Sequence, residues 1–312
     1  MSHTSPTLPD FETWAQRWRE HFEAQAQQTL PAADNPNAEL ALLAQAMRYA
    51  VLDGGKRVRA LLVYAAGALT NAHPANLDKA ALAVEYVHAY SLIHDDMPCM
   101  DNDVLRRGKP TVHVRYGEAL AMLAGDALQP EAFSVLCSAE VDDAVKAALV
   151  SELSNASGVA GMCGGQAVDL LNVGRAMDLE ALRCMHAMKT GALMRAAVRM
   201  GALCGTPELA RAVMPRLDAY AQAMGLAFQV IDDILDVTAD SATLGKTAGK
   251  DEANDKPTYV SVLGLEKARE LAQECLSRAR GALTSLEEEG LVEPASTLRL
   301  AQMADYVIGR NC

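Results

Sequence analysis

Apolar residues recur along most of this chain every three to four positions, the spacing that places them on one face of a helix. The recurrence predicts helical segments over residues 39–52, 57–70, 74–93, 116–139, 141–160, 178–203, 207–236, 266–289 and 294–310. The alternation that would indicate a half-buried strand is not found. The pattern therefore predicts an all-α fold, with Pro130 kinking or restarting the helix in which it lies.

Stretches rich in Gly, Pro and short polar residues separate the helices. Residues 1–10 are expected to form a loose arm, and a loop is expected at residues 31–39. Residues 238–258 form an unusually long polar stretch, and loops of this length often have a function. Since no Pro/Gly/Ser-rich linker divides the chain, a single domain over residues 1–312 is predicted.

Composition narrows the class of protein. Half of the residues are hydrophobic and only 4% are aromatic, while Ala, Leu and Met, which favour helices, are abundant. The net charge of −12 argues against binding to nucleic acid or to anionic membranes. Seven scattered cysteines without a CxxC pair indicate reduced thiols, and the first residues do not resemble a signal peptide. A cytoplasmic protein without stable membrane association is therefore expected.

An acidic cluster lies inside the apolar segment FQVIDDILD, residues 228–236. Asp232 and Asp236 are four residues apart and share one helix face, with Asp233 beside them and Gln229 one turn earlier. Like charges at this spacing repel each other, and the apolar neighbours leave little room for solvation. A solvated acidic face is the alternative. A bound divalent cation explains the cluster better, because carboxylate oxygens suit Mg²⁺.

A second group of acids lies in HDDMPCMDND, residues 94–103. Asp95 and Asp96 are adjacent, whereas Asp101 follows a proline at which the helix is expected to end, so that Asp101 folds back towards Asp95. Carboxylates at a helix C-terminus are disfavoured unless a positive group neutralises them. His88, seven residues before Asp95, lies on nearly the same face and is a candidate for holding a phosphate.

Basic residues accompany both acidic clusters. GGKRVRA, residues 54–60, places three of them at the start of a predicted helix, where backbone amides also attract anions. In chain order the basic candidates are Lys56, Arg57, Arg59, Arg106, Arg107, Lys189, Lys246 and Lys256. Each alone would be ordinary surface charge. Together with the acidic clusters they predict diphosphates that Mg²⁺ bridges to carboxylates, with Arg and Lys on the remaining oxygens.

At these residues the chain resembles the trans-isoprenyl diphosphate synthases, most closely the bacterial farnesyl diphosphate synthases. The motifs that carry the resemblance are LDGGKRVRALL, HAYSLIHDDMPCMDNDVLRRGKPTVH, LAGDAL, GMCGGQAVDL, MKTGAL, GLAFQVIDDILDV, LGKTAGKD and ADYVIGR. The resemblance implies a homodimer of antiparallel helical bundles, each around a deep apolar cavity. It also implies an enzyme that condenses isopentenyl diphosphate with dimethylallyl or geranyl diphosphate to farnesyl diphosphate (C15).

The same resemblance implies a role for each candidate residue. The diphosphate of isopentenyl diphosphate, the homoallylic substrate, would be bound by Lys56, Arg59, His88 and Arg107. The allylic diphosphate would be held by Arg106, Lys189, Lys246 and Lys256. About three Mg²⁺ ions would be bound by Asp95, Asp96, Asp101, Asp232, Asp233 and Asp236, with Asp95, Asp101 and Asp232 as the direct ligands.

The implied mechanism follows from charge. Mg²⁺ and the basic residues, above all Lys189 and Arg106, stabilise the departing diphosphate until the allylic C–O bond ionises. Thr190, Gln229 and the Lys189 carbonyl would lie beside the allylic cation. The double bond of isopentenyl diphosphate then attacks, and a proton is lost to the departed diphosphate. A side-chain general base is not expected.

Product length is expected to depend on Tyr90, which lies about 7.5 Å along the helix from Asp95. Its ring would form the floor of the apolar cavity and limit the product to C15. The Pro98–Cys99 insertion also resembles the farnesyl-making pattern. The alternatives are a geranylgeranyl (C20) synthase, a terpene cyclase, which would not need the homoallylic site, and a non-catalytic partner subunit, which typically lacks one acidic cluster.

Overall fold

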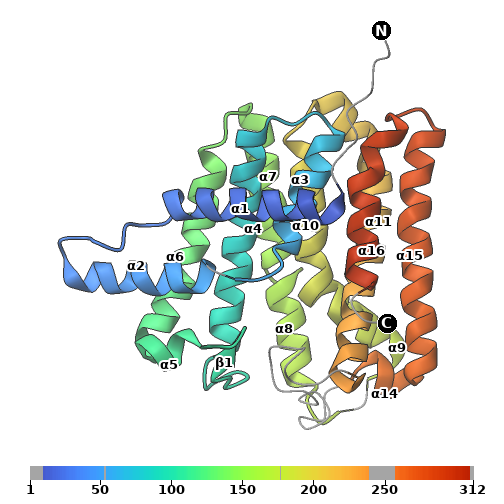
Figure 1. Ribbon diagram of the computed structural model, residues 1–312. Coiled ribbons are helices and arrows are strands. Elements are labelled where there is room, and N and C mark those ends of the chain that lie inside the picture. Colours follow the sequence, from blue (N-terminus) through green and yellow to red (C-terminus); the bar gives the residue numbers. More distant parts are fainter. Residues whose placement is uncertain (1–9, 53, 176, 239–256, 310–312) are drawn as a thin grey trace.

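The computed structural model describes residues 10–52, 54–175, 177–238 and 257–309. Almost all of the regular structure in these residues is helical, and the expected all-α fold is confirmed (Figure 1). The expectations for residues 1–9 and for most of the loop at 238–258 lie outside the described residues. In the described part of the chain, no helix is both long and apolar enough to cross a membrane.

The first half of the chain contains α1 (Phe11–Thr29), α2 (Ala38–Val51), α3 (Val58–Leu69), α4 (Pro74–Asp95), the short hairpin β1 (Leu105–Arg106) and β2 (Lys109–Pro110), α5 (Val112–Tyr116), α6 (Glu118–Cys137) and α7 (Asp143–Ser157). The second half contains α8 (Met162–Leu171), α9 (Leu179–His186), the π-helical turn η1 (Ala187–Gly191), α10 (Ala192–Leu203), α11 (Pro207–Thr238), α14 (Tyr259–Leu263), α15 (Leu265–Glu288), the 3₁₀ turn η2 (Pro294–Thr297) and α16 (Leu298–Ile308).

The helices pack around α10, which contacts α3, α4, α7 and α11. On one side α4 packs along α6, and on the other α11 packs along α15 and α15 along α16. Figure 1 shows α1 crossing the bundle in front of α3 and α4, which it contacts. One connected core of apolar side chains reaches from Ala15 to Ile308. The single domain over residues 1–312 stays a prediction.

Polar residues before the helices explain where several of them begin. The side chain of Asp10 accepts a hydrogen bond of 3.0 Å from the amide of Thr13 and so caps α1. The Asp178 side chain caps α9 in the same way, through the amide of Ala181 at 2.8 Å. Such caps satisfy amides that the helix itself leaves without a partner.

Several features differ from the expectation, and among them the hairpin of β1 and β2 and the short helices α5 and α14 were not expected. α1 and α8 were not expected, because residues 11–29 are mostly polar and α8 contains two consecutive glycines, which disfavour helix. The helix expected over 178–203 is interrupted by η1. α6 continues through Pro130, so the helix does not restart there. These local differences leave the order of the remaining helices as expected.

Candidate active site

Two adjoining cavities open near the carboxyl end of α4. The apolar cavity, of about 460 Å³, is lined mainly by apolar and sulfur-containing side chains from α4, α6 and α8. The polar cavity, of about 280 Å³, is lined by acidic and basic side chains from α4, α8, η1 and α11. The residues that line both are Arg59, His88, Leu92, Lys189 and Thr190. The polar cavity, which suits charged groups, therefore adjoins the apolar cavity, which suits a hydrocarbon chain.

The first acidic cluster turns back on itself at the end of α4. Asp95 is the last residue of α4, and the amide of Asp101 donates a hydrogen bond of 2.8 Å to its carbonyl oxygen. A bond of 3.1 Å from the amide of Asp103 to the Asp96 carbonyl continues the turn. Asp95 lines the apolar cavity, and Asp101 lines the polar cavity. The expected return of Asp101 towards Asp95 is confirmed.

The second acidic cluster brings Asp232 and Asp233 to the polar cavity from α11. Asp233 is buried, and its two oxygens accept hydrogen bonds from Nε2 of Gln229 at 2.9 Å and from the amide of Tyr259 at 2.8 Å. Asp236, one turn after Asp232, is buried as well. Asp232 and Asp233 of α11 therefore line the cavity that Asp101 of the first acidic cluster also lines.

The donors at the polar cavity fit Mg²⁺. Asp101, Asp232 and Asp233 line it with carboxylate oxygens, which Mg²⁺ prefers as ligands. Burial raises the pKa of Asp95 to about 6, and Lys189 opposes this shift while Asp101 adds to it. Among the residues that the structure describes, no three His, Cys, Asp or Glu side chains could hold an ion by themselves. The donor set therefore fits Mg²⁺ shared with phosphate oxygens.

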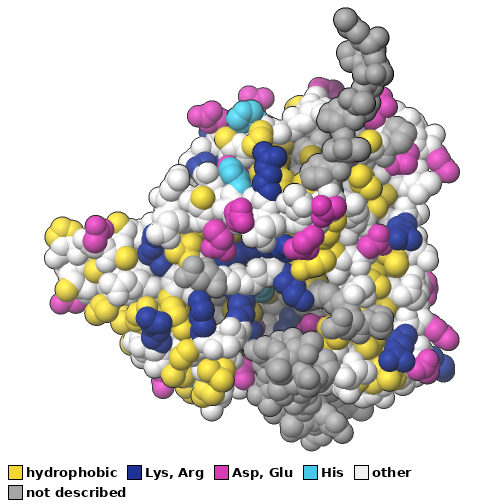
Figure 2. Space-filling model, viewed as in Figure 1, with side chains coloured by type: hydrophobic (Ala, Val, Ile, Leu, Met, Phe, Trp, Pro, Cys, Tyr) yellow, Lys and Arg dark blue, Asp and Glu magenta, His cyan; other side chains and the backbone are white. Residues whose placement is uncertain are grey.

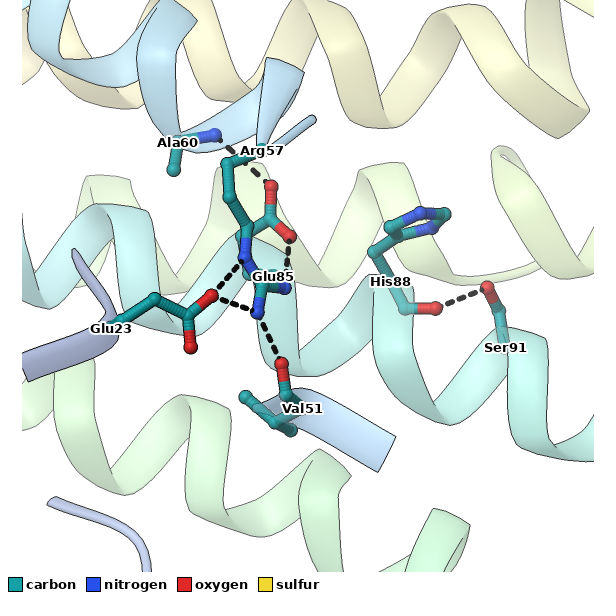
Figure 3. A network of polar contacts seen from close by, with 7 residues as sticks. All are labelled: Glu23, Val51, Arg57, Ala60, Glu85, His88 and Ser91. Carbon is teal, nitrogen blue, oxygen red and sulfur yellow. Dashed lines mark hydrogen bonds and ion pairs between the residues drawn. The ribbon is translucent and has the colours of Figure 1, made fainter. Parts of the chain in front are cut away.

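Arg57 builds the start of α3. It is the N-cap residue, with a φ of 51°, and it is buried. Its guanidinium donates to Oε1 of Glu23 at 2.9 Å and to Oε2 of Glu85 at 3.4 Å, and lies 4.7 Å from the ring centre of Phe22. Figure 3 shows this guanidinium between Glu23 and Glu85, with His88 further along α4. Arg57 therefore has a structural role next to the cavity.

Arg59, in contrast, lines both cavities with a donor that lacks a partner. Its Nε is buried and makes no hydrogen bond within the described residues. Burial lowers the pKa of Arg59, and Glu85 opposes this shift while Arg107 adds to it. Glu85 is buried and also accepts a bond of 3.2 Å from the amide of Ala60, which caps α3 from α4. Because an unmet buried donor is costly, an anion beside Arg59 would be favoured.

His88 is neutral in this surrounding. Burial lowers the pKa of His88 well below its usual value, and the cations Arg59 and Arg107 lower it further. A neutral imidazole carries one N–H donor, which is enough for a hydrogen bond to a phosphate oxygen. His88 also lines both cavities. Its role as a phosphate ligand stays a prediction.

Arg107 reaches back to the turn before α3. A Cβ atom at Gly55 would lie 2.8 Å from the guanidinium carbon of Arg107, and Gly55 has a φ of +89°. The positive φ would strain any larger residue at this position, and the end of the Arg107 side chain would have to move aside for it. Lys56, the next residue, is exposed. Arg107 and Lys56 therefore lie at the turn that leads into the helix of Arg59.

Positive side chains are also grouped on the surface. Figure 2 shows Lys and Arg side chains gathered around a hollow below α1. The whole chain has a net charge of −12. A local basic group on an acidic protein can attract an anionic ligand without general affinity for polyanions.

Arg106 and Lys189 are each held by a buried carboxylate. Nε of Arg106 lies 2.8 Å from both oxygens of Asp96. Nζ of Lys189 donates a bond of 2.6 Å to Oδ2 of Asp169. Charged hydrogen bonds of this length fix the position of a cation. Lys189 is therefore held at the junction of the two cavities, which it lines.

Thr190 and Gln229 are in direct contact. Oγ1 of Thr190 donates to Oε1 of Gln229 at 3.2 Å. Lys189 and Thr190 belong to the π-helical turn η1, a distortion that is frequent at functional sites. Gly165 of α8 packs closely on η1. A Cβ atom at Gly165 would lie 2.2 Å from the backbone nitrogen of Lys189. The structure thus brings together the residues that the sequence placed beside the allylic cation.

Tyr90 lines the apolar cavity together with several methionines, and its role as the floor of the cavity stays a prediction. It is 6% exposed, and its hydroxyl oxygen lies 3.4 Å from Sγ of Cys163. Its ring meets the edge of the His94 ring, with 5.9 Å between the ring centres. Tyr90 is therefore fixed at a definite place in the wall.

Lys246 and Lys256 lie outside the described residues. Three residues contact the expected site although the sequence analysis gave none of them a role, namely Glu85 and, within the motif GMCGGQAVDL, Cys163 and Asp169. Glu85 and Asp169 were recognisable in principle, because each is a single acid among apolar residues, in ALAVEYV and in QAVDLL. Cys163 carries no such signal.

Comparison with known proteins identifies the relatives of the chain. Residues 40–290 match the family model described as polyprenyl synthetase. The farnesyl diphosphate synthase of Escherichia coli is 53% identical over 270 residues, which cover 86% of this chain and 89% of that protein. The chloroplastic geranylgeranyl pyrophosphate synthase of Capsicum annuum is 45% identical over 270 residues, which cover 86% of this chain and 71% of that protein.

A solved structure shows a similar fold. The geranyltransferase of Helicobacter pylori, in complex with magnesium and isoprenyl diphosphate, superposes with a TM-score of 0.81. Its sequence is 33% identical, and the match covers 99% of this chain and 98% of that one. The isoprenoid synthase type of helical fold is therefore shown.

Proposed function

Because the chain belongs to the polyprenyl synthetase family, we propose that it is a magnesium-dependent farnesyl diphosphate synthase. The single observation that carries this proposal is the polar cavity that joins an apolar cavity, where Asp101 of the first acidic cluster and Asp232 and Asp233 of the second meet the side chains of Arg59, His88 and Lys189. Such a site can bind two diphosphates and bury a growing hydrocarbon chain. The greater identity to the farnesyl than to the geranylgeranyl relative favours C15 as the product.

The two substrates would use different basic residues. Lys56, Arg59, His88 and Arg107 form the homoallylic group, which would bind isopentenyl diphosphate. Arg106 and Lys189 form the paired group, which would hold the allylic diphosphate together with Lys246 and Lys256. The unmet Nε of Arg59 and the neutral imidazole of His88 support the first assignment, and the position of Lys189 at the cavity junction supports the second.

Magnesium would be held by carboxylates of both clusters. Asp95, Asp101 and Asp232 are proposed as direct ligands, with Asp96, Asp233 and Asp236 around them, for about three ions. Bound Mg²⁺ neutralises the charge that develops on the departing diphosphate. The oxygen donors at the polar cavity support this assignment, as does the magnesium in the Helicobacter pylori structure.

In the reaction the allylic C–O bond breaks, and its electron pair leaves with the diphosphate. The double bond of isopentenyl diphosphate supplies the electron pair of the new C–C bond, and a proton then passes to the departed diphosphate. Lys189 and Arg106 would stabilise the leaving group, while Thr190 and Gln229 would turn oxygen atoms towards the cation. The apolar cavity excludes water from the cation.

Product length is proposed to depend on Tyr90. Removing the ring with Tyr90→Ala opens space below the growing chain, so we expect C20 to replace C15 as the main product. Mass analysis of the dephosphorylated alcohols measures this ratio. An unchanged C15 product would show that Tyr90 is not the floor of the cavity.

The proposed enzyme is a cytoplasmic homodimer. Large apolar side chains on α5 and α6, such as Val114 at 51% and Leu123 at 51% exposure, support an interface there. Light scattering after size-exclusion chromatography measures the mass in solution. A monomer at all protein concentrations would contradict the dimer.

Product analysis tests the proposed function. Purified protein is incubated with isopentenyl diphosphate, dimethylallyl diphosphate and Mg²⁺, with an EDTA control, and the alcohols are resolved by mass after dephosphorylation. C15 alcohol that disappears with EDTA is expected. Mainly C20 alcohol would keep the chemistry and change the product. No condensation would leave a cyclase or a non-catalytic partner subunit.

A further inference from the structure

The Tyr90 hydroxyl meets the thiol of Cys163 in the wall of the apolar cavity. The two atoms are 3.4 Å apart, and either of them can donate the hydrogen bond. Tyr90 belongs to α4 and Cys163 to the first turn of α8, so the contact connects two separate helices. Both side chains line the cavity.

The Tyr90 ring is also held from a second side. His94, one turn further along α4, meets it edge-on with 5.9 Å between ring centres. Nε2 of His94 lies 3.1 Å from the carbonyl oxygen of Met122 on α6. The orientation of the Tyr90 ring therefore depends on contacts from α4, α6 and α8 together.

Cys163 has a fixed position relative to Lys189. Gly165, two residues after Cys163, lies so close to η1 that a Cβ atom on it would be 2.2 Å from the backbone nitrogen of Lys189. The first turn of α8 and the turn that carries Lys189 are thus in direct backbone contact. One rigid unit carries both the proposed anchor of the allylic diphosphate and the thiol that contacts Tyr90.

We propose that Cys163 is a specificity-determining residue, whose thiol holds the Tyr90 ring across the apolar cavity and so sets the product length. The proposal rests on the proposed function. Elongation stops when the chain between the diphosphate and the floor has no more room. If the hydroxyl loses its partner, the ring gains freedom to turn aside, and one further addition becomes possible.

Four variants test the proposal by the ratio of C20 to C15 products. Tyr90→Phe removes the hydroxyl and keeps the ring, and Cys163→Ala removes the thiol. In each we expect the ratio to rise about fivefold, in keeping with the net value of one hydrogen bond. Cys163→Ser keeps a partner for the hydroxyl, so its ratio should stay within about twofold of the parent. Cys137→Ala, which removes an exposed thiol at the end of α6 that lines neither cavity, is the control and should leave the ratio unchanged.

The double variant Tyr90→Phe with Cys163→Ala shows whether the two groups act together. Its ratio should not exceed that of the stronger single variant, because both changes remove the same contact. An unchanged ratio in Tyr90→Phe would overturn the proposal, since the thiol would then only occupy space. An equal rise in Cys137→Ala would overturn it as well. If the parent protein makes C15 and the variants keep its product ratio, only this inference is contradicted. If the parent protein does not condense the substrates, the proposed function is contradicted too.

Discussion

Arg59, of the homoallylic group, and the paired group of basic residues are held in opposite ways. The carboxylates of Glu23 and Glu85 bind the neighbouring Arg57 (Figure 3), whereas Nε of Arg59 is buried and makes no hydrogen bond within the described residues. In the paired group each cation has its own buried carboxylate, as Lys189 has Asp169.

The difference indicates a division of labour. Donors that face a cavity without a partner can take up an anion with little rearrangement, so the homoallylic group should determine substrate affinity. Cations that are fixed by short charged bonds are held in place, so the paired group should act on the leaving group in the transition state. The comparison predicts effects on KM from the first group and effects on kcat from the second.

The largest effect is expected for Lys189→Ala. Removing a preorganised positive charge from the leaving group should lower kcat about 10²–10³-fold, while KM for isopentenyl diphosphate changes little. Steady-state kinetics with both substrates measure the two constants. Lys146→Ala, which removes a half-buried lysine of α7 that is paired with Asp143 and lines neither cavity, is the control. If Lys189→Ala changed only KM, the proposed role of the paired group in the transition state would be contradicted.

Arg59→Ala should act on affinity. The loss of a charged hydrogen bond to the diphosphate should raise KM for isopentenyl diphosphate about 10–100-fold and change kcat much less. The control is Arg216→Ala, which removes a surface arginine paired with Glu289. If kcat fell by as much as kcat/KM, Arg59 would belong functionally with the paired group.

Asp169→Asn tests whether the buried carboxylate beside Lys189 is needed to hold its ammonium group in place. Asparagine keeps an oxygen acceptor near Lys189 but removes the charge, so the ammonium is held less firmly. We expect kcat to fall about 3–10-fold with little change in KM. The fluorescence or heat of unfolding of the variant checks that the fold is intact. A higher kcat would show that Asp169 only competes with the substrate for Lys189.

The smallest effect concerns His88 and pH. Because the pKa of folded His88 is lowered, the unfolded chain binds a proton below pH about 6.5 and the folded protein does not. His88 therefore does not change the free energy of unfolding above that pH, and it lowers this free energy as the pH falls below it. Between pH 7.5 and 5.5 the free energy of unfolding of His88→Gln should fall about 1 kcal/mol less than that of the parent. Urea unfolding at the two pH values measures this, and equal losses would mean that His88 titrates normally.

Much of the fold was predictable because helix formation is local. The apolar period located α2, α3, α4, α6, α7, α10, α11, α15 and α16, since neighbours along one face determine whether a helix can be buried. α1 and α8 escaped prediction for a related reason. α1 buries a narrow stripe that includes Ala15, Phe22 and Ala26, and α8 is stabilised by its close packing on η1 rather than by its own residues.

The sequence by itself determined the chemistry of this protein. Helical spacing predicted one shared face for Asp232, Asp236 and Gln229 and another for His88 and Asp95, whereas the roles of the basic residues followed from the resemblance to a known family. The return of Asp101 to Asp95 could be derived too, because a proline ends the helix locally.

Only the tertiary structure decided which of these groups are paired. Asp169 and Lys189 are 20 residues apart, Glu85 and the amide of Ala60 are 25 apart, and Tyr90 and Cys163 are 73 apart. The helical period states which side chains share a face, but not which faces meet. That depends on how closely helices approach, and here Gly165 sets the approach of α8 to Lys189.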